Sequence, residues 1–230
     1  MSVADRLTVV RRRVADAARS AGRDPASVRL VAVSKTFPID AVREAYAAGQ
    51  REFGENRVQE GLQKISLSSD LEIRWHLLGH LQMNKARKAA AAFALVQSVD
   101  SVELLERIDL AAADQGARPE LLIQVDLAGE TTKHGAPPVD AMAIIRSAER
   151  CRAARVVGLM TIPPFFENPE QARPFFAELR NRRDTLLKEG VEPRLLQELS
   201  MGMSHDFEIA VQEGATIVRL GTAIFGERHV

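Results

Sequence analysis

Short runs of apolar, often β-branched residues alternate along the chain with longer amphipathic segments that end near Gly or Pro. Residues 28–34 (VRLVAVS) are almost continuously apolar, as in a strand buried on both faces of a sheet. The amphipathic segment that follows has Pro38 near its start and Gly49 at its end, which is typical of a helix. Recurrence of this pattern predicts strands at residues 28–34, 51–54, 73–78, 94–98, 121–127, 155–162, 195–200 and 215–220. The intervening helices are expected at residues 38–49, 55–65, about 84–92, 102–115, 139–151, 169–189 and 204–214, the last capped by Ser204.

A further helix is expected before the first strand. Leu7, Val10 and Val14 recur at helical spacing, Ser2 is a suitable cap and Gly22 ends the run. Eight strand–helix pairs without a linker in 230 residues predict one domain, residues 1–230. The expected fold is therefore an α/β, closed (βα)8 TIM barrel with an extra N-terminal helix. An open doubly wound sheet is the alternative, although it usually needs fewer strands.

Composition excludes several classes of protein. Lys+Arg and Asp+Glu both number 31, so no net positive charge exists to attract nucleic acid or an anionic membrane. No apolar run is long enough to span a bilayer. The Arg- and Ala-rich first 20 residues carry acidic residues and lack the apolar core of a secretory signal. A single cysteine, Cys151, excludes an internal disulfide, and together these features predict a cytoplasmic protein.

Polar and small residues collect where the predicted strands end, which is where barrels of this kind place their chemistry. Lys35 directly follows the first buried strand, and it is one of only six lysines against 25 arginines. Partial desolvation at such a position favours a neutral amine that can form a Schiff base. The alternative is a lysine that extends from the barrel rim into solvent.

The ends of the last two strands predict a phosphate site. Residues 200–204 (SMGMS) precede a helix whose first turn has free amides, and Gly221 and Thr222 offer a close approach and a hydroxyl. Simple helix capping is the alternative. Arg219 lies within the last strand, where it either donates to a ligand in the barrel mouth or forms a structural ion pair. His76 and His80 lack the helix and the glutamate of a zinc motif, so no metal site is expected.

Six segments of the chain, in order, carry a resemblance to a known family: VAVSKTFP, FGENRVQE, WHLLGHLQMNK, QSVDS, GLMTIPP and ELSMGMSHDFEIAVQEGATIVRLGTAIFG. They resemble the YggS/PROSC family of pyridoxal phosphate homeostasis proteins over about residues 30–228. The resemblance implies an alanine-racemase-type barrel that holds pyridoxal 5'-phosphate (PLP) as a Schiff base on Lys35. The cofactor-binding residues that it implies are Lys35, Asn56, Ser200, Gly202, Ser204, Arg219, Gly221 and Thr222. The chain departs from the family pattern at Asp126 and His205.

Three functions are compatible with these residues: a PLP carrier that supplies apo PLP-dependent enzymes, a single-domain PLP-dependent racemase with weak activity, and a Schiff-base aldolase without PLP. A racemase needs a second proton-transfer group opposite Lys35. The only tyrosine, Tyr46, lies within the first barrel helix, and the chain ends soon after the eighth strand. The sequence therefore favours the carrier without robust catalysis, with no catalytic residues, no nucleic-acid or membrane partner, and a monomeric state.

Overall fold

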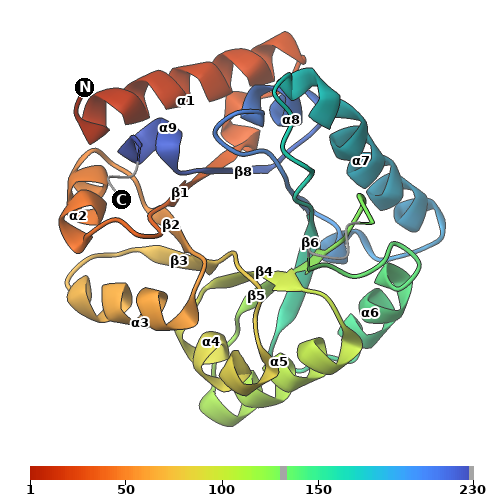
Figure 1. Ribbon diagram of the computed structural model, residues 1–230. Coiled ribbons are helices and arrows are strands. Elements are labelled where there is room, and N and C mark those ends of the chain that lie inside the picture. The colour runs from red at the N-terminus through yellow and green to blue at the C-terminus, as the bar shows by residue number, and fades with distance from the viewer. Residues whose placement is uncertain (130–133, 228–230) are drawn as a thin grey trace.

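The sheet is a closed barrel of parallel strands in the order in which they occur along the chain (Figure 1). The computed structural model describes residues 1–129 and 134–227. The first and last strands pair with each other, with Val31 opposite Arg219, so no edge strand remains. In these ranges the strands are β1 (Arg29–Val33), β2 (Glu52–Glu55), β3 (Arg74–Leu77), β4 (Leu95–Val99), β5 (Glu120–Gln124), β6 (Arg155–Met160), β7 (Glu198–Ser200) and β8 (Ile217–Leu220).

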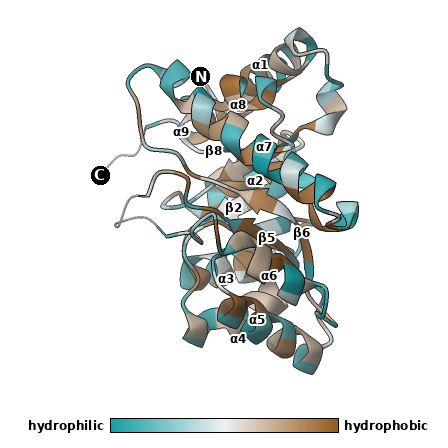
Figure 2. Cartoon of the chain, turned by 90° about the vertical axis from the view of Figure 1, so that its right-hand side faces the viewer, coloured by the Kyte–Doolittle hydropathy of each residue, from teal (hydrophilic) through white to brown (hydrophobic). Residues whose placement is uncertain are grey.

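Helices surround the barrel and bury their apolar faces against it (Figures 1 and 2). They are α1 (Val3–Ser20), α2 (Ile39–Ala47), α3 (Val58–Leu67), α4 (Ala86–Ala92), α5 (Val102–Gln115), α6 (Ala141–Ala148), α7 (Arg173–Lys188), α8 (Phe207–Gln212) and α9 (Thr222–Phe225). The extra N-terminal helix α1 begins with a reciprocal capping box between Ser2 and Asp5, and it packs against α8 and α9. The predicted barrel, its eight strands and its additional first helix are confirmed.

Several predicted boundaries are wrong by a few residues, and three of these differences have an identifiable physical reason. The helix expected from residue 55 begins at Val58, because Glu55 ends β2 and its buried carboxylate pairs with Lys64. The strand expected at 195–200 is reduced to β7, because Pro193 starts a short 3-10 turn. Ser204 does not cap the helix that follows it, since its hydroxyl accepts hydrogen bonds from residues beyond β8, and α8 begins at Phe207.

The inside of the barrel has an apolar and a polar part. A small apolar cluster lies within it: Val31, Leu95, Leu122, Val157, Met160 and Ile217. Four buried polar side chains, His76, Gln97, Ser200 and Arg219, are linked by hydrogen bonds, and the bond from Ser200 on β7 to Gln97 on β4 joins strands that are not neighbours in the sheet. A contact between strands on opposite sides is possible only through the centre of the barrel. The interior is therefore a packed core that contains a row of hydrogen-bonded polar side chains.

None of the helices in the described ranges combines the length and the apolar character needed to cross a bilayer.

Candidate functional site

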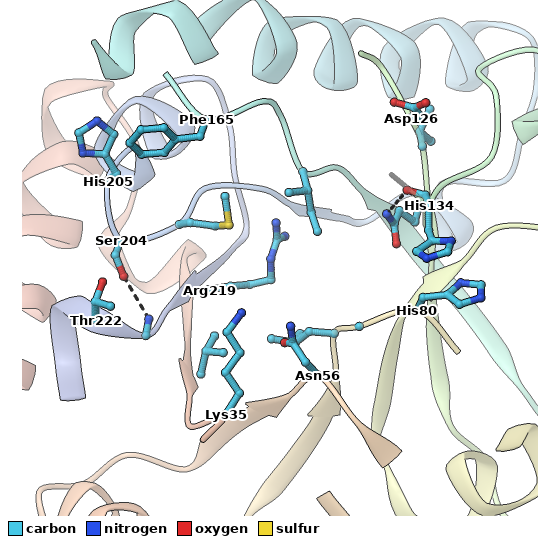
Figure 3. A pocket seen from close by; sticks show the side chains of 18 residues that line it. Lys35, Asn56, His80, Asp126, His134, Phe165, Ser204, His205, Arg219 and Thr222 are labelled. Carbon is cyan, nitrogen blue, oxygen red and sulfur yellow. Dashed lines mark hydrogen bonds between the residues drawn. The ribbon is translucent and has the colours of Figure 1, made fainter. Parts of the chain in front are cut away.

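A cavity of about 490 Å³ opens among the loops that follow the strands (Figure 3). This volume lies within the range of roughly 300–1,000 Å³ that is usual for small-molecule sites. Lys35 after β1, Asn56 after β2 and Arg219 on β8 all line it. The residues expected at strand ends therefore converge, although they are distant in the sequence.

Six of the eight residues expected to bind the cofactor line the cavity: Lys35, Asn56, Ser204, Arg219, Gly221 and Thr222. The other two, Ser200 and Gly202, do not. Ser200 is fully buried and accepts a hydrogen bond from Arg219, and the carbonyl of Gly202 accepts one from the Arg219 amide. Both residues thus hold Arg219 in place through hydrogen bonds and do not themselves face the cavity.

Arg219 is a cation in the barrel interior with only 4% of its surface exposed. Its guanidinium donates to Ser200 Oγ at 2.6 Å and to the carbonyl of Thr161 at 2.9 Å, both neutral oxygens. Among the described residues no carboxylate forms a salt bridge with Arg219. Asp206, whose carboxylate accepts from the amide of Met203, favours the charged form of Arg219 only from a longer distance. Burial lowers the pKa of Arg219 to about 10, so the group remains charged at neutral pH. A buried cation that lines a cavity is suited to an uncharged acceptor such as a ring nitrogen.

Lys35 is held in place by hydrogen bonds to the residues on either side of it. Lys64, buried on α3, donates to the Ser34 carbonyl at 2.7 Å, to Glu55 at 2.7 Å and to Glu60 at 2.9 Å. The Ser34 hydroxyl donates to Glu55 Oε1 at 2.6 Å. The amide of Thr36 donates to Glu60 Oε1 at 2.6 Å, and Thr36 has a left-handed backbone conformation, with φ of 70°.

This arrangement fixes an unfavourable turn at Lys35. A non-glycine residue at positive φ costs of order 1–3 kcal/mol and persists only when its surroundings impose it. Burial raises the pKa of Glu55, and Lys64 opposes that effect. No sequence motif indicates Lys64, and the only signal for it is the scarcity of lysines in the chain.

The opposite end of the cavity combines hydroxyls and backbone amides. Ser204 Oγ accepts from the amides of Gly221 at 3.1 Å and Ala223 at 3.3 Å, which joins the loop after β7 to the loop after β8 (Figure 3). Thr222 lies beside this contact. Gly221 is not required by packing, since a Cβ there would meet nothing closer than 3.4 Å. This end is suited to an anionic group of a ligand.

A third wall carries His80, His134 and Asp126, and Asp100 lies behind His80 without lining the cavity. The rings of His80 and His134 stack with centroids 3.7 Å apart, and His80 Nδ1 lies 3.4 Å from Asp100 Oδ2. No strand-end pattern indicates His134, because it lies well beyond the end of β5 in the sequence. Asp126, a departure from the family pattern, accepts from the amides of Ala128 and Gly129 and so stabilises its own turn.

Other histidines and the tyrosine occupy separate places. His76 is fully buried within the barrel while His80 lies at its mouth, so the two do not form a metal site together. His205, the other departure, lies at the cavity rim, 3.1 Å from the carbonyl of Glu167. Tyr46 accepts from the backbone amide of Glu72 on the outside of the barrel, far from a proton-transfer position.

Comparison with known proteins places the chain among sequences of similar length. The sequence profile of the family described as alanine racemase, N-terminal domain, matches residues 6–229. The pyridoxal phosphate homeostasis protein of Aquifex aeolicus is 42% identical over 228 residues, covering 99% of each chain. The human pyridoxal phosphate homeostasis protein is 43% identical, covering 96% of this chain and 85% of the human one.

Solved structures show the same fold. PipY of Synechococcus elongatus with PLP bound is 42% identical, with a TM-score of 0.86 over 98% of this chain and 100% of PipY. The alanine racemase of Streptomyces lavendulae is 18% identical, with a TM-score of 0.71 over 98% of this chain and 58% of the racemase. At that identity, the likeness to the racemase shows the fold alone.

We expect Lys64→Met to lower the free energy of unfolding by about 3–5 kcal/mol, because Glu55 would remain buried without its cation. The exposed Lys188, at the end of α7, gives a matched control, and Lys188→Met should change stability little. Urea denaturation of the two variants and the wild type measures both effects. Equal stability of all three would contradict the role assigned to Lys64.

The two glycines near the anionic end should respond differently to alanine. Gly202 has φ of +93°, and a Cβ there would lie 2.5 Å from that of Ala210, so Gly202→Ala should cost about 2–4 kcal/mol of stability. Gly221→Ala should change stability by less than about 1 kcal/mol, because its Cβ has room. Thermal or urea unfolding tests the pair, and the reverse order of the two losses would refute the assignment.

Proposed function

Since this chain belongs to the pyridoxal phosphate homeostasis proteins, within the family of alanine racemase N-terminal domains, we propose that it binds PLP. The cofactor is held as a Schiff base on Lys35, and the protein serves intracellular PLP (vitamin B6) homeostasis and supply. The observation that carries this assignment is the buried cation Arg219, which lines the same cavity as Lys35. The PLP-bound PipY structure, at 42% identity, supports the choice of cofactor.

The residues of the cavity fit the chemical groups of PLP. Lys35 condenses with the aldehyde, forming a C=N bond and releasing one water molecule. Thr222 and Ser204 supply hydroxyls for the phosphate, and Ser204 can donate its own hydrogen while it accepts the two amides. The lack of a side chain at Gly221 leaves space on the same wall. Asn56 lies between Lys35 and the histidine wall (Figure 3) and is placed to contact the ring.

Arg219 favours a carrier over an enzyme. When bound, PLP supplies an electron sink whose strength depends on protonation of its ring nitrogen. A guanidinium can only donate a hydrogen bond, so Arg219 keeps that nitrogen unprotonated and weakens the sink. The only tyrosine, Tyr46, points away from the cavity, which removes the residue most suited to a second proton transfer. We therefore infer a cytoplasmic, monomeric carrier that passes PLP to apo PLP-dependent enzymes and lacks robust catalysis.

A racemase is the second candidate. His80, which lines the cavity and has Asp100 beside it, favours this function, since a histidine beside a carboxylate can move a proton. The measurement of amino-acid exchange below separates the two functions.

Borohydride reduction of the PLP-loaded protein should fix the cofactor to Lys35, because this lysine shares the cavity with Arg219. Peptide mapping by mass spectrometry locates the adduct. Lys35→Ala should lose both the adduct and the visible absorbance of the bound cofactor, while Lys85→Ala keeps both. An adduct on Lys85 in the wild type would refute the site.

The loaded protein should transfer PLP to an apo-enzyme without exchanging the α-protons of free amino acids, because the ring nitrogen is not protonated. Incubation of several amino acids in deuterated water, followed by mass spectrometry, measures the exchange. A coupled assay with an apo-transaminase measures the transfer. Rapid exchange that disappears in Lys35→Ala would establish the racemase instead.

A further inference from the structure

Five polar side chains from five strands form a continuous row through the barrel interior. Arg219 on β8 donates to Ser200 Oγ on β7 at 2.6 Å, and Ser200 donates to Gln97 Oε1 on β4 at 2.6 Å. The amide nitrogen of Gln97 lies 3.0 Å from His76 Nδ1 on β3. His76 Nε2 in turn lies 3.1 Å from Glu52 Oε2 on β2, an electrostatic contact in which neither atom makes a regular hydrogen bond. We refer to these five residues as the interior chain.

The direction of every hydrogen bond in the interior chain is determined independently from each end. Arg219 has no acceptor, so Ser200 must accept from it and turn its hydrogen toward Gln97. The negative charge of Glu52, 3.1 Å away, favours a hydrogen on the facing His76 Nε2, which leaves Nδ1 as an acceptor. Gln97 therefore directs its NH2 at His76 and its carbonyl at Ser200. Both ends demand the same orientation of the Gln97 amide, so the chain has one consistent polarity.

Burial makes this polarity persistent. Ser200, Gln97 and His76 are each fully buried, so water cannot replace a lost partner. Burial also lowers the pKa of His76, which keeps the ring neutral and Nδ1 available as an acceptor. The pKa of Glu52 is lowered although burial alone would raise it, because His76, Arg29 and Arg74 favour its charged form. A cation at one end and an anion at the other thus polarise the neutral groups between them.

We propose that Gln97 and His76 are positioning residues for Arg219: through Ser200 they hold the guanidinium in one orientation toward the cofactor ring. This inference rests on the proposed function, because it concerns the group that faces the ring nitrogen of PLP. Neither residue lines the cavity. A ring contact at the mouth of the barrel is therefore governed by residues in its interior.

The tautomer of His76 tests the polarity without any cofactor. Nitrogen-15 NMR of histidine-labelled apo-protein should show a neutral ring protonated at Nε2, with assignment by loss of the signal in His76→Asn. A ring protonated at Nδ1, or a charged ring at neutral pH, would reverse the Gln97 amide and overturn the proposal. Folding of a Gln97 variant is not needed for this measurement.

Gln97→Leu tests the effect on the cofactor site. The substitution removes both hydrogen bonds of the Gln97 side chain. We therefore expect the Kd for PLP to rise about tenfold and the pH titration of the visible absorbance to shift. Gln50→Leu is the matched control, since Gln50 is also buried and its amide nitrogen donates to the carbonyls of Leu30 and Glu52. That control should lower stability yet leave the titration of bound PLP unchanged.

A double-mutant cycle identifies the route of the effect. In an Arg219→Met background, Gln97→Leu should cause no further rise in the Kd for PLP, because its influence passes through Arg219. An equal rise in both backgrounds, or an unchanged Kd and titration in the single variant, would overturn this inference while leaving PLP binding intact. Failure of the wild-type protein to bind PLP would overturn the proposed function itself, and the positioning role with it.

Discussion

Closure of the sheet by pairing of β1 with β8 is the constraint on which the rest of the structure depends. Parallel strands with one chain direction send all their carboxyl ends to the same rim, and closure brings the first and last of those ends together. Lys35 and Thr222, from opposite ends of the chain, therefore line one cavity. The same closure forces side chains of β3, β4, β7 and β8 to meet in the interior. The cavity and the interior chain below it are consequences of one topological fact.

The two cations that are buried in the described part of the chain are stabilised in different ways. Lys64 sits between two carboxylates, so its charge is compensated locally and its bonds are used to fix the turn around Lys35. Arg219 donates to neutral oxygens, so its charge is stabilised by oriented dipoles and by the more distant carboxylate of Asp206. A cation that is stabilised by dipoles can still bind a further acceptor, whereas a cation paired with carboxylates attracts a further acceptor only weakly. This difference assigns a structural role to Lys64 and a ligand-facing role to Arg219.

Function in this family cannot be inferred from the fold alone, because the racemase barrel at 18% identity has the same architecture. The chemistry depends on the groups that surround the cofactor. Here the cavity is lined by Lys35 and the buried Arg219, while Tyr46 contacts Glu72 on the outside of the barrel. The similarity to PipY and to the Aquifex protein, at 42% identity, extends over nearly the whole chain.

The sequence by itself determined the barrel, because eight apolar strand patterns and their helices are local signals of periodicity and chain punctuation. It also located Lys35, Arg219 and Thr222, since strand ends are positions that a linear pattern can identify. Tertiary structure alone decided the partners of those residues. Lys64, Gln97 and His134 follow no strand-end pattern, and Ser204 satisfies amides of a distant loop rather than of its own helix. Such contacts depend on which segments closure brings together in space, and no local spacing in the sequence records that.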